Sequence, residues 1–141
     1  MADLRPVFDD LRRVRAELSA GVGLRLRREF GLPLIWVEMM TAIAKTRNCR
    51  VHDLSAWLRV SAGGASKLVD RLEAVGYCWR VPNPGDRRSS MLQLTPAGWQ
   101  TFEQASQAVE EELERLLAAP LSPAQISGLA ATLRDLRAAD L

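Results

Sequence analysis

The chain has 141 residues, of which 48% are hydrophobic and two are cysteines, so we expect one domain with an apolar core and no disulfide framework. The net charge of +2 is unevenly spread, because residues 59–100 hold six basic and three acidic residues (+3) whereas residues 101–141 hold three basic and seven acidic residues (−4). No apolar run approaches the roughly 18 residues of a membrane span and the N-terminus does not resemble a signal peptide, which predicts a cytoplasmic protein.

The first predicted element is a long helix over residues 4–30, whose apolar side chains recur every three or four positions. Gly31 is expected to end this helix, and Pro33 to begin a second helix that reaches residue 47. The second helix is apolar on more than one side, so we expect it to be buried. Residues 49–51 are predicted to form a very short strand beside a later sheet.

Residues 51–98 follow the order short helix, tight corner, second helix and hairpin, which is the order of a winged helix-turn-helix. The short helix is expected to end near Val60, and Ser61 is placed to cap the second helix. One face of the second helix is apolar, whereas residues 62–67 on the opposite face are small or polar. A helix of such low relief suits the major groove of DNA. Gly76 is expected to close it.

The hairpin begins with residues 77–81, which alternate with a period of two and predict a strand. Residues 82–85 contain two prolines and a glycine, so we expect them to break that strand before a second alternating run at residues 91–94. The charged residues 86–88 therefore lie at or beside the hairpin tip. A guanidinium group at that place can enter a minor groove, although a polar tip also serves merely to keep a hairpin soluble.

Two more helices are predicted after the hairpin, over residues 96–117 and 122–139. Ser122 is expected to cap the last helix, with Pro123 at its first position. The first and last helices of the chain both carry apolar seams that one small body has little room to bury. We therefore expect a homodimer formed by the two ends of the chain; the alternative is a monomeric helical bundle.

One motif in the hairpin region is specific enough to indicate a family. The pattern is Asp-x-Arg followed by Leu-Thr-x-x-Gly, here Asp86, Arg88, Leu94, Thr95 and Gly98. With the run Ser-Lys-Leu-Val-Asp-Arg-Leu-Glu before it, the chain closely resembles the multiple antibiotic resistance regulator (MarR) family of bacterial transcription factors. The lengths of the flanking helices fit as well, so the resemblance covers nearly the whole chain.

The resemblance implies a mainly α fold with a small β-wing. Residues 33–99 would form the winged helix-turn-helix DNA-binding lobe, and residues 1–32 with 100–141 a helical dimerisation lobe. The implied function is sequence-specific binding of double-stranded DNA by a homodimer at a pseudo-palindromic operator. Such a protein is usually a repressor that responds to a small effector. The positive charge of residues 59–100 agrees with a face that meets phosphate, although charges also simply solvate surfaces.

Gly63 and Gly64 depart from the pattern of the family. Each glycine inside a helix costs roughly 1 kcal/mol relative to alanine. Either the second helix of the motif begins after them, or it becomes ordered only on DNA.

The residues expected to contact DNA lie on this helix and on the hairpin. We expect small and polar side chains near the helix start to meet base edges, Ser61 and Arg71 to meet phosphate, and Asp86 to orient a neighbouring arginine. By resemblance, Arg88 corresponds to the wing arginine of the family. The predicted set is Ser61, Ala62, Gly64, Ser66, Lys67, Arg71, Asp86, Arg87 and Arg88.

A second expected site follows from the resemblance alone. The effector cleft of the family would fall at an aromatic and methionine-rich cluster that includes Trp36, Met40, Trp99 and Phe102. Its ligand would be aromatic or anionic, and Arg12, Arg15 or Arg28 are candidate partners for an anion. The alternative is that the cluster belongs to the core, as such residues at helical spacing usually do.

Other chemistries find little support in the sequence. Cys49, His52 and Cys78 invite a metal or thiol site, but a structural zinc needs four ligands and no fourth is evident. Both thiols are more simply read as small buried apolar groups. The single histidine has no nucleophile arranged around it, so we expect neither an enzyme nor a cofactor. The remaining alternatives are a winged-helix protein-interaction module and a regulator that responds to thiol oxidation or metal through Cys49 and Cys78.

Overall fold

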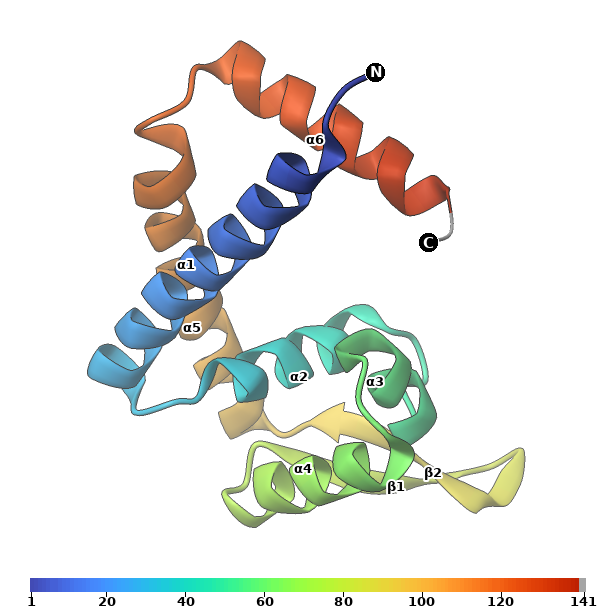
Figure 1. Cartoon of the computed structure of the whole chain (residues 1–141). Helices are drawn as coiled ribbons and strands as arrows, with labels where there is room; N and C mark the ends of the chain where they lie inside the picture. Colours follow the sequence, from blue (N-terminus) through green and yellow to red (C-terminus); the bar gives the residue numbers. More distant parts are fainter. Residues whose placement is uncertain (140–141) are drawn as a thin grey trace. The chain divides into compact units, whose positions relative to one another are not determined.

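The computed structural model describes residues 1–139, except for the side chain of Arg87. It is mostly helical with one two-stranded antiparallel sheet, which confirms the predicted fold class (Figure 1). Its elements in chain order are α1 (Leu4–Phe30), α2 (Leu34–Lys45), α3 (Val51–Leu58), α4 (Ala62–Ala74), β1 (Cys78–Asn83), β2 (Asp86–Leu94), α5 (Pro96–Leu113), the π-helical turn η1 (Glu114–Ala118) and α6 (Pro123–Ala138).

The chain forms two compact units, and each is described separately. The first unit consists of residues 1–25 and the chain from residue 108 onward. The second consists of residues 26–107. The boundaries fall inside α1 and α5, so both helices contribute to both units.

The core of the second unit lies where α2, α3 and α4 pack together. Its largest fully buried side chains include Met39 and Met40 of α2, Leu54 of α3 and Leu72 of α4. The prediction that α2 is a buried helix is therefore confirmed. The predicted helix start is displaced by one residue, because Pro33 is the N-cap and the helix begins at Leu34.

Local signals set both ends of α4. The Ser61 hydroxyl accepts a hydrogen bond from the backbone N–H of Gly64 at 3.0 Å, so the predicted N-cap is confirmed. Gly76 closes the segment with a φ of +84°, which a glycine adopts without strain. Because α4 begins at Ala62, Gly63 and Gly64 lie inside its first turn, and of the two alternatives for these glycines the later helix start is wrong.

The hairpin of β1 and β2, here called the wing, is longer than predicted. Pro82 was expected to break the first strand, but it pairs with Ser90 and β1 continues to Asn83. A proline is tolerated here because a two-stranded sheet has only edge strands, where a missing backbone N–H leaves no ladder partner unsatisfied. The pairing shifts register between Pro82 and Asn83. The predicted padding strand is confirmed only at Arg50, which bridges to Met91 on β2, because α3 already begins at the next residue.

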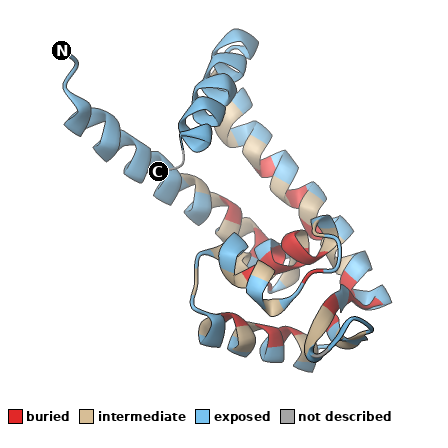
Figure 2. Cartoon of the chain, turned by 90° about the vertical axis from the view of Figure 1, so that its right-hand side faces the viewer, coloured by how far each residue is buried: buried red, intermediate tan, exposed pale blue. Residues whose placement is uncertain are grey.

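The first unit is built from the N-terminal part of α1, the end of α5, η1 and α6. Gly21 of α1 lies close to η1, because a Cβ at this position would be 3.0 Å from Leu116 Cδ1. Arg25 donates to Glu111 at 2.6 Å, and Arg115 donates to Glu112, which is mostly buried. Figure 2 shows α6 and the start of α1 as exposed along their length.

No single helix among the described residues is both long enough and apolar enough to cross a membrane. Those criteria are met only by Pro96–Ala118 and Pro123–Ala138 counted together, across a bend of 107°.

Candidate nucleic-acid interface

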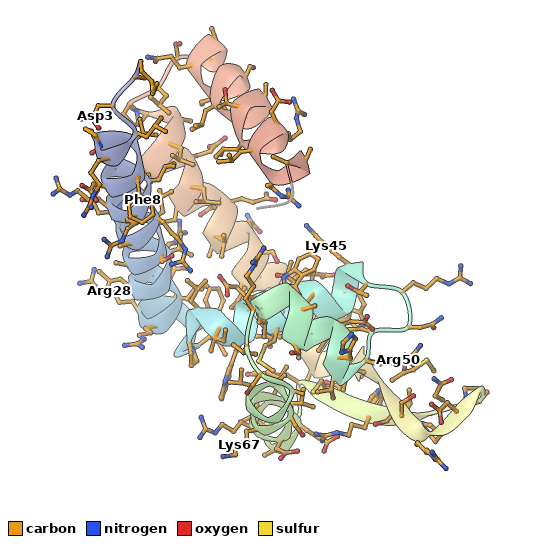
Figure 3. The ribbon with its side chains drawn as sticks, turned by 45° about the vertical axis from the view of Figure 1, so that its right-hand side comes forward. Asp3, Phe8, Arg28, Lys45, Arg50 and Lys67 are labelled. Carbon is orange, nitrogen blue, oxygen red and sulfur yellow. The ribbon has the colours of Figure 1, made fainter. Side chains whose placement is uncertain are left out.

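The outer face of α4 carries most of the residues predicted to read DNA. Ser61, Ala62, Lys67 and Arg71 are exposed, and Figure 3 shows Lys67 on the outer side of the helix. Gly64 and Ser66 are partly exposed between them, whereas the opposite face is buried through Ala65, Val69 and Leu72. The fold thus presents the predicted set together along one side of the helix.

The first turn of this face has low relief, because two of its residues are glycines. A Cβ added to Gly63 would meet no other atom within 4 Å, so the first turn of α4 has open space in front of it. The positive end of the helix dipole favours an anion such as phosphate near this turn, although the Gly64 N–H is already bonded to Ser61. The low relief lets the backbone itself approach a partner surface.

The wing carries the second group of predicted residues. Arg88 is exposed on β2, and its backbone N–H donates to Asp86 Oδ1 at 2.9 Å. The described contact of Asp86 is therefore with the backbone, where it shapes the start of β2. Asp86 was expected to orient Arg87 or Arg88, and the side chain of Arg87 lies outside the described residues. A hollow of about 370 Å³ on the wing is lined by residues of both strands, namely Arg80, Val81, Pro82, Asn83, Arg88, Ser89 and Ser90.

Arg80 makes contacts that the sequence did not reveal. Its side chain leaves β1 and forms ion pairs with Asp70 at 2.8 Å and Glu73 at 3.1 Å, both on α4. An ion pair across seven or ten residues depends on how the chain reverses at Gly76, and no local spacing rule reports it. The alternation of the strand gave one usable signal, because it placed Arg80 on the same face as the buried Cys78.

The base of the wing is closed by the Leu-Thr-x-x-Gly motif. Thr95 donates through its hydroxyl to the Gly76 carbonyl at 2.5 Å, and through its backbone N–H to the Tyr77 carbonyl at 3.2 Å. The same hydroxyl accepts from the Gly98 N–H at 2.9 Å, which caps α5. One side chain therefore ties the end of α4 to the start of α5, and this explains why a threonine stands at this point of the motif.

The residues predicted for an effector site all lie in the second unit. Trp99 and Phe102 form an edge-to-face pair with ring centroids 5.9 Å apart, Trp36 is partly exposed, and Met40 is fully buried. A hollow of about 260 Å³ borders Trp99 on the side of β2, with Ile43, Thr46, Asn48, Met91, Leu92, Gln93 and Leu94. Of the candidate cations, Arg12 stacks on the Phe8 ring at 5.7 Å.

The two cysteines are buried and unpaired. Burial raises the pKa of Cys49 to about 11, with Asp53 adding to the shift, and burial with Glu73 raises the pKa of Cys78 to about 11. Thiols with such pKa values are almost entirely protonated at neutral pH and react slowly. Within the described part of the chain, no three His, Cys, Asp or Glu side chains gather as a metal site would require.

The helices α3 and α4 together with the wing define a winged helix-turn-helix. A model of the MarR family matches residues 30–89. The chain is 32% identical over 77 residues to the multiple antibiotic resistance protein MarR of Escherichia coli K12, which covers 55% of this chain and 54% of that protein. It thus spans about half the length of the curated relatives that it matches.

Solved structures extend the likeness of fold along the chain. A MarR variant from E. coli complexed with operator DNA has a TM-score of 0.84 at 22% identity, covering 96% of this chain and 99% of that one. A MarR family transcriptional regulator from Streptomyces coelicolor in complex with DNA has a TM-score of 0.83 at 20% identity, covering 94% and 84%. The winged-helix segment of the chain, residues 30–89, is thus similar to the MarR family, and the solved structures show the same fold beyond it.

Proposed function

We propose that this protein is a sequence-specific, double-stranded DNA-binding transcriptional regulator. The observation that carries the proposal is the exposed, flat outer face of α4 next to an arginine-bearing wing, both in one compact unit. A recognition helix of this kind enters a major groove, and a wing arginine meets the adjacent minor groove. The two DNA-bound MarR structures of similar fold support the same reading.

In this proposal the DNA contacts are divided between two tasks. Ser61 and Arg71 meet phosphate and set the register of the helix, whereas Ser66 and Lys67 meet base edges with the backbone at Gly64 close by. The remaining proposed contacts are Ala62 on α4 and Asp86, Arg87 and Arg88 on the wing.

The active species is proposed to be a homodimer. In the first unit α1 exposes large apolar side chains, with Val7 54% and Val14 47% exposed, and α6 does the same with Leu129 at 41%. A hollow of about 520 Å³ in the same unit is lined mainly by apolar side chains of α1, of η1 and the segment after it, and by Leu129 of α6. A second copy of the chain would cover these surfaces and would give two recognition helices for the two halves of a pseudo-palindromic operator.

The regulator is proposed to act in the cytoplasm, as a repressor without enzymatic activity that a small effector releases from DNA. Its dimerisation lobe would comprise residues 1–32 and 100–141, and its DNA-binding lobe residues 33–99. The effector would be aromatic or anionic and would contact Trp36, Trp99 and Phe102, with Met40 behind them. The effector would bind more tightly to a form of the dimer in which the two recognition helices no longer fit one duplex.

The test is the salt dependence of binding to duplex DNA that the wild-type chain selects from a random-sequence library. If six to ten phosphates are neutralised, log K falls with log salt at a slope of roughly −5 to −9. Replacing Arg87 and Arg88 by alanine should weaken binding to every sequence, while the same change at exposed Arg13 of α1 should not. A slope near zero would exclude a DNA-binding function and leave the protein-interaction module as the better reading.

A further inference from the structure

Arg80 joins the wing to the recognition helix by three hydrogen bonds. Its backbone N–H donates to Glu73 Oε2 at 3.0 Å, Nη1 donates to Glu73 Oε1 at 3.1 Å, and Nη2 donates to Asp70 Oδ1 at 2.8 Å. The two carboxylates are three residues apart on α4, so they lie on one face of the helix. A single guanidinium therefore spans one turn of α4 from the first strand of the wing.

These contacts fix the orientation of β1 relative to α4 as well as the distance between them. A guanidinium is planar and its donors diverge in a rigid fork, so engaging two carboxylates at once sets the rotation of β1 about α4. The Tyr77 N–H also donates to the Leu72 carbonyl at 3.1 Å, which anchors the chain just before the strand. Arg80 lies beyond that anchor on β1, whereas β2 is held separately by the bridge between Met91 and Arg50. The Arg80 contacts are therefore the ones described that tie β1 directly to the side of α4.

Arg80 is poorly suited to the other roles open to an arginine here. Its side chain is only 26% exposed and its Nη atoms are engaged by carboxylates, so it does not present a free cation to phosphate. Asp70 is 65% exposed and Glu73 40% exposed, and ion pairs with that much solvent contact add little to overall stability. The role left for these ion pairs is to set the position of β1 relative to α4.

We propose that Arg80 is a positioning residue, which through Asp70 and Glu73 holds the wing at the angle to α4 that lets both reach one DNA duplex. The inference rests on the proposed DNA-binding function and adds the residue that sets the spacing between its two contact surfaces. Neither Arg80 nor Glu73 needs to touch DNA for this role.

The negative charge of Asp70 and Glu73 allows the positioning role to be distinguished from a simple electrostatic effect on DNA binding. Glu73→Gln and Asp70→Asn remove negative charge beside a DNA-binding surface, so electrostatics alone predicts tighter binding. Positioning predicts the opposite sign. We expect Arg80→Ala, Arg80→Lys and Glu73→Gln each to weaken binding of the selected duplex, by roughly 2- to 30-fold, with an unchanged salt slope. Arg5→Ala, which removes the exposed pair with Asp9 in the first unit, is the matched control and should have no effect.

A second readout needs no DNA. Hydrogen exchange at the backbone amides of residues 88–92 should quicken in Arg80→Ala and Glu73→Gln, and not in Arg5→Ala, while circular dichroism shows that each variant is folded. Tighter binding by Glu73→Gln, a salt slope reduced by about one in Arg80→Ala, or unchanged exchange in the wing would each overturn the inference. If the wild-type chain shows no salt-dependent binding to duplex DNA, the proposed function fails as well. If the wild type binds and Arg80→Ala and Glu73→Gln bind equally well, only the inference about Arg80 fails.

Discussion

Gly98 lies directly against the backbone of Tyr77, since a Cβ built on residue 98 would stand 2.0 Å from the Tyr77 carbonyl oxygen. The same carbonyl accepts the Thr95 N–H at 3.2 Å. This close approach brings the first turn of α5 against the chain that leaves α4, and it has no room for any side chain.

Gly98→Ala should therefore destabilise the protein, by about 3 kcal/mol, because the obstructing atom belongs to the backbone and cannot rotate away. Urea unfolding followed by circular dichroism measures the change. An unaltered midpoint would mean that the contact between α5 and Tyr77 is looser than described.

Gly63→Ala is the natural counterpart, because its Cβ would meet no other atom within 4 Å. The substitution should raise the free energy of unfolding by about 1 kcal/mol through helix propensity alone. Since Gly63 is not among the proposed contacts, DNA affinity should stay near that of the wild type. A large loss of affinity without loss of stability would place the DNA closer to the first turn of α4 than proposed.

Lys67→Ala should change which sequences are bound as well as how tightly. If its ammonium group donates to a base edge, discrimination at one base pair of each half-site should fall by about 1–3 kcal/mol. Binding to a set of single-base variants of the selected duplex measures this. Equal weakening on all of them, with a salt slope lower by about one, would assign Lys67 to phosphate instead.

Burial of the thiols makes the free energy of unfolding depend on pH. Their pKa values of about 11 lie above the usual 9.0, so the neutral forms are favoured in the folded chain. Their contribution to stability is therefore fully present below about pH 9 and is lost as the pH rises toward 11. The unfolding free energies of wild type and Cys49→Ala/Cys78→Ala should converge across that interval. If the two differ by a constant amount, the thiols are not titrating as described.

The same burial bears on the thiol-switch alternative. At neutral pH, a thiol reagent should modify both cysteines only after unfolding in urea. Rapid modification of the folded protein, with loss of DNA binding, would revive that alternative.

Leu129→Glu should convert the proposed dimer into a monomer, because it introduces a charge on the apolar side of α6. Ala131→Glu is the matched control, since two residues further along an α-helix the side chain points about 200° away. Light scattering coupled to size exclusion measures the mass of each variant. A wild-type chain of monomer mass would contradict the dimer outright.

The sequence predicted the ends of elements better than it predicted their packing. Ser61, Gly76 and Ser122 act within a few residues of themselves, through a hydroxyl cap or a positive φ, so a local pattern is enough to place them. Pro82 misled because its effect depends on whether the strand has a second neighbour, which a local pattern does not contain.

The candidate site divides along the same line. The outer face of α4 could be predicted because helical spacing alone decides which residues share a side. The contacts of Arg80 with Asp70 and Glu73 could not, because they join a strand to a helix across a chain reversal. The backbone contact of Asp86 with Arg88 was missed for a different reason, since a carboxylate next to two guanidinium groups also has nearby amides to choose from.

The π-helical turn at Glu114–Ala118 has a consequence for how this sequence tolerates change in length. Its Ala119 N–H reaches back five residues to the Glu114 carbonyl, at 3.1 Å, where an ordinary helix would reach back four. The segment therefore contains one residue more than the same stretch of a regular α-helix would. Deleting a single residue there should convert the π-helical turn into regular α-helix. An insertion cannot be absorbed in this way.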